Sequence, residues 1–329
     1  MKNSKNVFLT WGKYQSRSET MKDFFEYEVK YFNSDKNNLL LKYVIYSFQT
    51  LSYLIRKKPE TIWVQLPPSP LMHIVRIYTF FSKAKVIYDC HNAIFRKPWV
   101  DTPFTKWLLK NGASKLIVHN EDVKSAYSTL IPKNALVLLD KPFTNEINES
   151  LSDKTVLEKF NLTQSKYIIL PASFNSDEPI EEILALEDKL GSSYKLVITG
   201  NYKKRIKDTS QYKSIIFTGW ITSQEYKELF LNSAIVLGLT NFDLIQLSAA
   251  NEGLIYKIPM VLSDTPTLRR LFPIGTIFTN NDADSMSKNL NNMIDNISKY
   301  KYEIEQLSFE KAQEWRLQAD WVKKSIKEG

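Results

Sequence analysis

Short apolar runs alternate with amphipathic helical patterns along most of the chain. In the first half these runs are residues 7–11 (VFLTW), 61–66 (TIWVQL), 84–89 (AKVIYD), 115–120 (KLIVHN) and 135–140 (ALVLLD). In the second half they are residues 166–173, 194–200, 214–219, 233–240, 259–264 and 275–279. Near-continuous Ile, Val and Leu runs separated by helices are typical of buried parallel strands. The pattern therefore predicts an α/β fold with two successive Rossmann-like parallel-sheet domains.

The boundary between the domains is predicted in residues 144–166, a polar stretch without a strand pattern. We expect domains at 1–145 and 146–329. Two helical stretches, about 282–302 and 304–327, end the chain, and the last one carries Trp315 and Trp321. Its apolar face needs a partner, and we expect this helix to pack back on the first domain.

The longest apolar segment runs from Leu39 to Ile55 and contains Lys42 and several hydroxyl and amide side chains. It falls short of the roughly 20 residues that span a bilayer. We expect a mostly buried helix, with a helix that touches a membrane surface as the alternative. The first eleven residues contain no apolar stretch of signal-peptide length.

Charge and cysteine content narrow the class of protein. Residues 1–145 carry 22 Lys and Arg against 11 Asp and Glu, whereas residues 146–329 carry 22 against 25. The basic half would suit lipid headgroups or a diphosphate-linked substrate, or it is simply a solvated surface. No nucleic-acid recognition motif accompanies the charge. The single cysteine excludes an intrachain disulfide and a Cys-rich zinc site, which favours a reducing, cytoplasmic compartment.

Asp89, Cys90 and His91 follow the strand pattern at 84–89 and would lie at its carboxyl end, where parallel α/β sheets bind ligands. A metal is not expected, because the other histidines, His73 and His119, stand at unsuitable spacing. Alternation along a strand puts Cys90 in the core if its neighbours face a ligand. Asp89 and His91 are then a candidate proton-handling pair, with a structural histidine as the alternative.

The second half contains a strand, a tight turn and a helix in SIIFTGWITSQEYKELF, where Gly219 permits the turn and Ser223 can cap the helix. A further helix is predicted from about Asp243 to Tyr256. Its small residues around Ser248 would let a phosphate approach the backbone amides, and Glu252 could accept hydrogen bonds from a ribose.

Together these segments resemble the C-terminal half of group-1 glycosyltransferases of the GT-B fold, in LVITG near Gly200, FTGWITSQEYKELFLNSAIVLGLTN and NEGLIYKIPMVLSD. The resemblance implies two domains facing a cleft, with a nucleotide sugar in the second and an acceptor in the first. It implies that Glu252 holds the nucleotide ribose. The stretch DCHN also resembles the Asp-x-His-Asn of an inverting β-mannosyltransferase, which makes His91 the candidate base.

Two positions depart from that family. Leu244 stands where many retaining members have a second glutamate, and PASFNSDEPIEE replaces the usual basic pair after the first strand of the domain. Cations would instead come from Lys203, Lys204 and Arg205, or from the basic first half across the cleft. The expected donor-binding residues are Glu252, Ser248, Gly219, Trp220, Gly200, Ser173, Lys204 and Arg205. The expected acceptor-binding residues are Gly12, Lys13, Arg17, Arg96 and His119.

The sequence thus predicts a glycosyltransferase that uses a UDP- or GDP-sugar, without a metal or other cofactor. The acceptor would be a saccharide or a lipid-diphosphate-linked saccharide in surface polysaccharide synthesis, at the inner face of the cell membrane. An epimerase or hydrolase of nucleotide sugars, and a non-catalytic partner subunit, stay open as alternatives.

Overall fold

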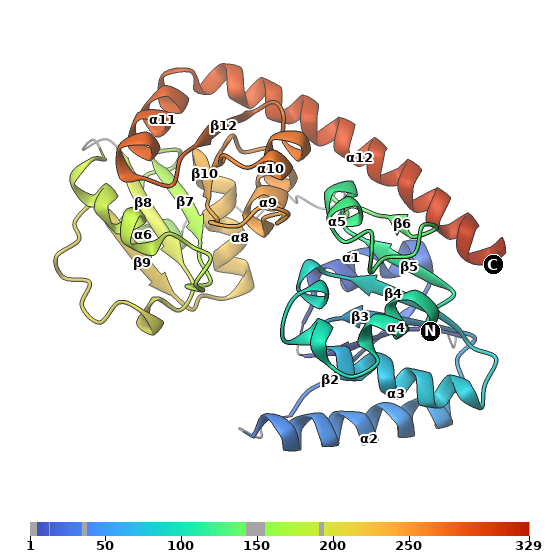
Figure 1. Cartoon of the computed structure of the whole chain (residues 1–329). Helices are drawn as coiled ribbons and strands as arrows, with labels where there is room; N and C mark the ends of the chain where they lie inside the picture. The colour runs from blue at the N-terminus through green and yellow to red at the C-terminus, as the bar shows by residue number, and fades with distance from the viewer. Residues whose placement is uncertain (1–4, 13, 35–37, 143–154, 191–193, 329) are drawn as a thin grey trace. The chain divides into compact units, whose positions relative to one another are not determined.

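A computed structural model describes residues 5–12, 14–34, 38–142, 155–190 and 194–328. Lys13, one of the expected acceptor residues, lies outside the described residues. The internal contacts divide the chain into two units, one of residues 1–141 with 314–329 and the other of residues 142–313. Each unit is built on its own sheet (Figure 1).

The sheet of the first unit has six strands, all parallel, in the order β2-β1-β3-β4-β5-β6. The strands are β1 (Asn6–Trp11), β2 (Glu28–Phe32), β3 (Thr61–Leu66), β4 (Lys85–Cys90), β5 (Lys115–Val118) and β6 (Leu136–Val137). Five of them coincide with the predicted runs. Strand β2 was not predicted, because this edge strand is only half-buried and its sequence, EVKYF, lacks a continuous apolar run.

Helices connect these strands and flank the sheet. They are α1 (Ser16–Phe25), α2 (Leu39–Lys57), α3 (Ser69–Phe80), α4 (Thr105–Asn111) and α5 (Glu121–Ala126), with the 3-10 turns η1 (Asn92–Phe95) and η2 (Trp99–Asp101). Helices α2 and α3 lie side by side (Figure 1). Asn120 caps α5 by accepting a hydrogen bond from the Val123 amide.

The second unit also has a six-stranded parallel sheet, in the order β12-β11-β10-β7-β8-β9. The strands are β7 (Tyr167–Pro171), β8 (Lys195–Thr199), β9 (Ile215–Gly219), β10 (Ile235–Gly238), β11 (Met260–Ser263) and β12 (Thr276–Thr279). All six coincide with predicted runs, and the prediction of two parallel α/β sheets is confirmed. A buried cluster of aliphatic side chains from the sheet and its helices forms the core.

The helices of this unit are α6 (Thr155–Lys159), α7 (Ile180–Leu184), α8 (Ser223–Asn232), α9 (Ser248–Tyr256), α10 (Pro266–Leu271) and α11 (Ala283–Asp295), with the 3-10 turns η3 (Ala185–Asp188) and η4 (Tyr202–Lys204). Helix α12 (Ile297–Glu328) begins in the second unit and ends in the first. Thr222, not Ser223, caps α8, in a reciprocal pair with Glu225.

Helix α2 matches the predicted boundaries but not the predicted burial. Tyr46, Thr50 and Leu54 are its buried residues, whereas Leu40 is 78% exposed and Phe48 is 79% exposed. The expectation of a mostly buried helix is therefore wrong, because half of its apolar side chains are exposed. Among the described residues, no helix combines the length and the apolar character needed to cross a bilayer.

Candidate functional site

A pocket of about 620 Å³ lies at the carboxyl edge of the sheet in the second unit. Pro171, Thr199, Gly219 and Gly238, which end strands β7, β8, β9 and β10, line it together with the first turn of α9. Seven of the eight expected donor-binding residues line this pocket, namely Ser173, Gly200, Lys204, Gly219, Trp220, Ser248 and Glu252.

Arg205 does not line the pocket, contrary to expectation. It follows η4, and its Nη1 lies 4.0 Å from the carboxylate of Glu181. The pocket therefore has Lys204 as its lining cation, together with the carboxylates of Asp177, Glu178 and Glu252.

Glu252 lies one turn into α9, and its carboxylate is shielded from solvent rather than turned into bulk water. The hydroxyl of Tyr226, on α8, donates a hydrogen bond of 2.7 Å to its Oε2. Burial raises the pKa of Glu252 to about 7, and the Tyr226 hydrogen bond opposes that rise only in part. Near pH 7 the carboxyl group is therefore partly protonated, and a ligand whose hydroxyl groups donate hydrogen bonds to it would favour the ionised form. Tyr226 was missed from the sequence, because it meets Glu252 only through the packing of two helices.

Helix α9 begins at Ser248, five residues later than predicted, since residues 243–247 form a turn and an extended segment. Leu247 precedes it, and no side chain caps the helix. The first amides and the positive end of the helix dipole therefore lie at the pocket wall, an arrangement that favours an anionic group of a ligand.

Two glycines fix the shape of the opposite wall. Gly200 has φ +98°, and a Cβ atom there would lie 2.0 Å from the carbonyl oxygen of Ala172. Gly219 has φ +66° and turns the chain so that Trp220, which is 81% exposed, projects at the rim. Only glycine fits the first position without a clash, and the second position strains any other residue.

In the loop after β7, the carboxylate of Glu178 binds the hydrogen-bond donors of the same loop. The amide and hydroxyl of Ser173 donate to Oε1 of Glu178 at 2.9 and 2.7 Å, and the Phe174 amide donates to Oε2 at 2.7 Å. Lys204 Nζ donates to the Ser173 carbonyl oxygen at 2.9 Å. Ser173 lines the pocket as expected, but its donors are engaged by a carboxylate where the related family places basic residues.

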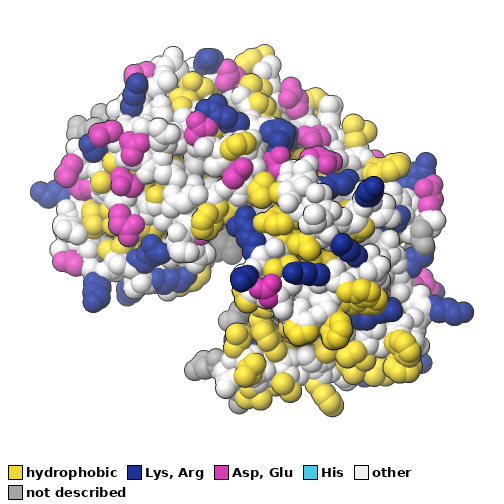
Figure 2. Space-filling model, viewed as in Figure 1, with side chains coloured by type: hydrophobic (Ala, Val, Ile, Leu, Met, Phe, Trp, Pro, Cys, Tyr) yellow, Lys and Arg dark blue, Asp and Glu magenta, His cyan; other side chains and the backbone are white. Residues whose placement is uncertain are grey.

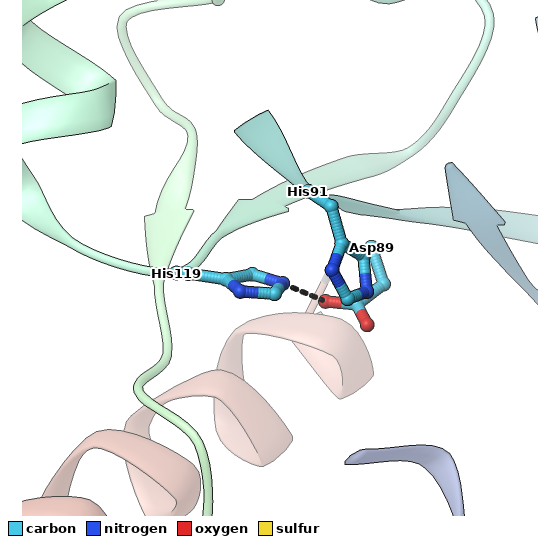
Figure 3. Close-up of side chains that lie close together, drawn as sticks. All are labelled: Asp89, His91 and His119. Carbon is cyan, nitrogen blue, oxygen red and sulfur yellow. Dashed lines mark ion pairs between the residues drawn. The ribbon is translucent and has the colours of Figure 1, made fainter. Parts of the chain in front are cut away.

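A second cluster lies in the first unit, where Asp89, His91 and His119 meet at the carboxyl edge of the sheet (Figure 3). Strands β4 and β5 are neighbours with Cys90 opposite Val118, so the next residues along each strand, His91 and His119, are adjacent. Their ring centroids are 4.2 Å apart. The expectation that His119 stands too far along the chain to join Asp89 and His91 was wrong, because residues distant in the sequence are neighbours when their strands pair.

Arg17 binds the Asp89 carboxylate, and this contact changes the role that we expected for Arg17. Arg17 was expected in a loop facing the acceptor, but it lies in the first turn of α1 and is buried. Its Nε and Nη2 donate to the Asp89 carboxylate at 3.0–3.2 Å, and its Nη1 donates to Asp140 at 2.7 Å. Burial raises the pKa of Asp89, but the Arg17 charge outweighs it and holds the pKa below its usual value.

Both imidazoles in the cluster are poised to accept a proton. Burial is the largest influence on His91 and His119 and lowers the pKa of each, so both rings are neutral near pH 7. Within the described part of the chain, Nε2 of each ring is buried without a hydrogen-bond partner. His119 Nε2 lies 4.0 Å from Oδ1 of Asp89.

The cluster also offers three ligand atoms within 4.8 Å of one another. However, the Asp89 carboxylate is already neutralised by the adjacent Arg17 guanidinium, which would repel a divalent cation. The arrangement suits a proton or a hydroxyl group better than a metal. Cys90 is fully buried, as predicted.

The remaining acceptor candidates do not gather into one described site. The Arg96 Nε donates to the Tyr127 hydroxyl at 3.0 Å, and the Gly12 amide donates to the Phe32 carbonyl oxygen at 3.0 Å. Of the four expected acceptor residues that the structure describes, His119 lies in the Asp89 and His91 cluster and Arg17 binds its carboxylate.

Comparison with known proteins identifies the fold. No family model matches the chain, and no curated protein sequence matches it. Among solved structures, HepE of Anabaena in complex with UDP-glucose is 10% identical, with a TM-score of 0.75 over 98% of both chains. Sucrose-phosphate synthase of Thermosynechococcus elongatus is 12% identical, with a TM-score of 0.70 over 98% of both chains.

A trehalose-phosphate synthase of Burkholderia xenovorans in complex with glucose-6-phosphate is 13% identical, with a TM-score of 0.66 over 89% of this chain and 79% of that one. The predicted likeness to the fold of GT-B glycosyltransferases is therefore confirmed over nearly the whole chain.

Proposed function

We propose that this chain is a glycosyltransferase that moves a sugar from a nucleotide sugar to a saccharide or lipid-diphosphate-linked saccharide. The observation that carries the proposal is the pocket of the second unit, where a buried glutamate and an uncapped helix start lie together at the carboxyl edge of a parallel sheet. The fold it shares with chains crystallised with UDP and UDP-glucose supports the same conclusion.

In this proposal the donor nucleotide lies along that pocket. The Glu252 carboxylate accepts hydrogen bonds from the two ribose hydroxyls, and the amides at the start of α9 bind the diphosphate. The exposed indole of Trp220 and the turn at Gly219 lie where a base ring can stack. Lys204, the lining cation, stabilises the departing diphosphate.

The acceptor would bind in the first unit, with His91 as the base that removes a proton from its hydroxyl. A neutral imidazole with a free Nε2 can accept that proton, and the negative charge of Asp89 raises the pKa of His91 and so supports its protonated form. Arg17 fixes Asp89 in place, and we regard it as a positioning residue rather than as a contact to the acceptor.

We further propose that the enzyme works at the inner face of the cell membrane, on a lipid-linked acceptor in surface polysaccharide assembly. Figure 2 shows apolar side chains gathered over the part of the first unit that contains α2, α3 and α4. The exposed members are Leu39, Leu40, Leu41, Val44, Phe48, Ile55, Ile77, Phe80, Phe81, Phe104 and Trp107. Basic residues such as Arg76, Lys106 and Lys110 accompany them. An apolar face with cations at its border fits an anionic membrane surface.

The test begins with calorimetry against UDP, GDP and their sugars, since the nucleotide is the first thing the proposal must specify. The correct donor should bind, and Glu252→Ala should weaken binding by about 1.5–3 kcal/mol, the scale of hydrogen bonds to a charged group. Transfer is then assayed with and without a lipid-diphosphate saccharide. Donor turnover that needs no acceptor would indicate an epimerase or hydrolase, and the lack of any nucleotide binding would indicate a non-catalytic partner subunit.

A further inference from the structure

The largest pocket described in the first unit lies at the edge of the sheet opposite the histidine cluster. Its volume is about 1120 Å³. Asn6, Thr61 and Lys85, which begin strands β1, β3 and β4, line it, whereas His91 and His119 follow strand ends at the other edge. The pocket is therefore separate from the proposed acceptor and base residues.

Its walls are apolar and come from elements that are distant in the sequence. Leu51 and Ile55 belong to α2, Ile77 belongs to α3, and Trp63 lies on β3. Ile55 and Ile77 are about half exposed, and they are also members of the apolar face of α2 and α3. The pocket and that face therefore share Ile55 and Ile77, and a hydrocarbon chain that contacts these two side chains touches both.

The charged residues of the lining leave an excess of positive charge. Five lysines and two glutamates line the pocket. Both glutamates are matched, because Lys323 pairs with Glu26 at 2.7 Å and Lys5 pairs with Glu60. Lys85 Nζ donates to the carbonyl oxygen of Ile326 at 3.3 Å.

Lys58, Lys83 and Lys327 remain, and all three are exposed. Their ammonium groups make no ion pair with any described residue. Three exposed lysines without an ion-pair partner beside an apolar cavity suit a ligand that carries both a negative group and an apolar body.

We propose that this pocket binds one molecule of an anionic membrane lipid. The acyl chain lies against Leu51, Ile55 and Ile77, with Trp63 at the wall, and Lys58, Lys83 and Lys327 contact the phosphate of the headgroup. A soluble phosphate would leave the apolar walls unused, and an uncharged lipid would leave the three lysines unpaired. The site adds recognition of a single lipid molecule to general adsorption on the bilayer, and it does not depend on glycosyl transfer.

The experiment uses the full chain and phosphatidylglycerol with brominated acyl chains, presented in uncharged detergent micelles. Bromine atoms near an indole quench its emission, and Trp107 on the apolar face is exposed to the micelle as well. Binding in the pocket is therefore followed as the part of the quenching that Trp63→Phe removes. We expect saturable quenching at one lipid per chain, with the equivalent brominated phosphatidylcholine at least about tenfold weaker. The triple variant K58E/K83E/K327E removes three cations beside the headgroup and adds three carboxylates, so it should weaken binding about 100-fold or more.

The matched control carries the same change of charge on exposed lysines of the second unit, K207E/K213E/K301E, and should bind as the wild type does. Ala84→Phe fills the pocket from a loop position without adding a tryptophan, and Ile77→Asp places a carboxylate in the apolar wall at a half-exposed site. Both should abolish the quenching of Trp63 while circular dichroism and the melting temperature show a folded chain.

Three results would overturn the proposal. These are equal quenching by phosphatidylcholine, quenching that persists in both pocket variants, and competition by glycerol 3-phosphate as effective as that by the lipid. A chain that instead forms dimers through this face, seen as a doubled mass that K58E/K83E/K327E and I77D abolish, would also overturn it.

Discussion

Binding of a nucleotide should release a proton from Glu252, and this is the sharpest consequence of the pocket in the second unit. In the free protein, burial raises the pKa of Glu252 from its ordinary value of 4.5 to about 7. Two ribose hydroxyls that donate to the carboxylate favour its charged form and so lower that pKa. If binding restores the ordinary value, the shift is worth about 3 kcal/mol.

The direction in which nucleotide affinity changes with pH depends on whether the free protein or the complex binds more protons. Because the free protein holds the proton up to about pH 7 and the complex does not, affinity should rise with pH between about 5 and 7 and level off above that range. At pH 6 the complex should release about 0.9 proton from Glu252 for each nucleotide bound.

Calorimetry at pH 6 in two buffers of different ionisation enthalpy measures this release. The nucleotide's own phosphate also titrates near this pH, so the matched control is Glu252→Gln, which keeps the shape and removes the titrating group. The difference between the two proteins isolates Glu252. Equal proton release by wild type and Glu252→Gln would refute the ribose assignment, because the carboxyl would then keep its proton in the complex.

Three further outcomes follow from the two sites. Arg17→Ala should lower the free energy of unfolding by about 3–5 kcal/mol, since it leaves Asp89 buried without its cation; a chemical-denaturation midpoint close to that of the wild type would contradict this. His91→Ala should reduce turnover roughly 10²- to 10⁴-fold with donor affinity unchanged, and the lowered pKa of His91 should put the acid limb of the wild-type rate profile below pH 6.5; near-normal turnover would remove His91 from the chemistry. Glu178→Ala should tighten binding of a nucleoside diphosphate by about 1 kcal/mol, because it removes a like charge and frees the amides of Ser173 and Phe174; weaker binding in calorimetry would mean that the loop depends on this carboxylate.

The buried strands could be predicted because burial on both faces leaves a continuous apolar run, which few other elements produce. Strand β2 lies at the edge of its sheet and mixes Glu28 and Lys30 with apolar residues, so its sequence carried no such signal. The start of α9 was placed too early for a related reason. Helical spacing is already present in residues 243–247, and only the tertiary structure delays the start of the helix to Ser248.

The two candidate sites were predictable to different degrees. In the second unit, Gly200 follows β8, Gly219 ends β9, and Ser248 begins the helix that comes after β10. The order of elements was therefore enough to bring them to one edge of the sheet. In the first unit, the Arg17 and Asp89 pair joins residues 72 positions apart. A lone arginine in a helical turn does not indicate which carboxylate it will bind. The sequence therefore suggested that Arg17 contacts the acceptor and did not suggest its ion pair with Asp89.

Helix α2 shows why an apolar pattern cannot by itself indicate what an apolar face contacts. Tyr46, Thr50 and Leu54 recur every four residues and form the buried stripe, and the Thr50 hydroxyl is satisfied there by a hydrogen bond from the Trp11 indole. The more apolar side chains, among them Val44 and Phe48, lie on the outer face. A helix whose exposed face is more apolar than its buried face is the reverse of the usual surface helix. The hydrophobic effect that would normally bury that face against a sheet is available instead for association with a membrane, which is why the same residues that defeated the prediction of burial support the proposal of a membrane-facing surface.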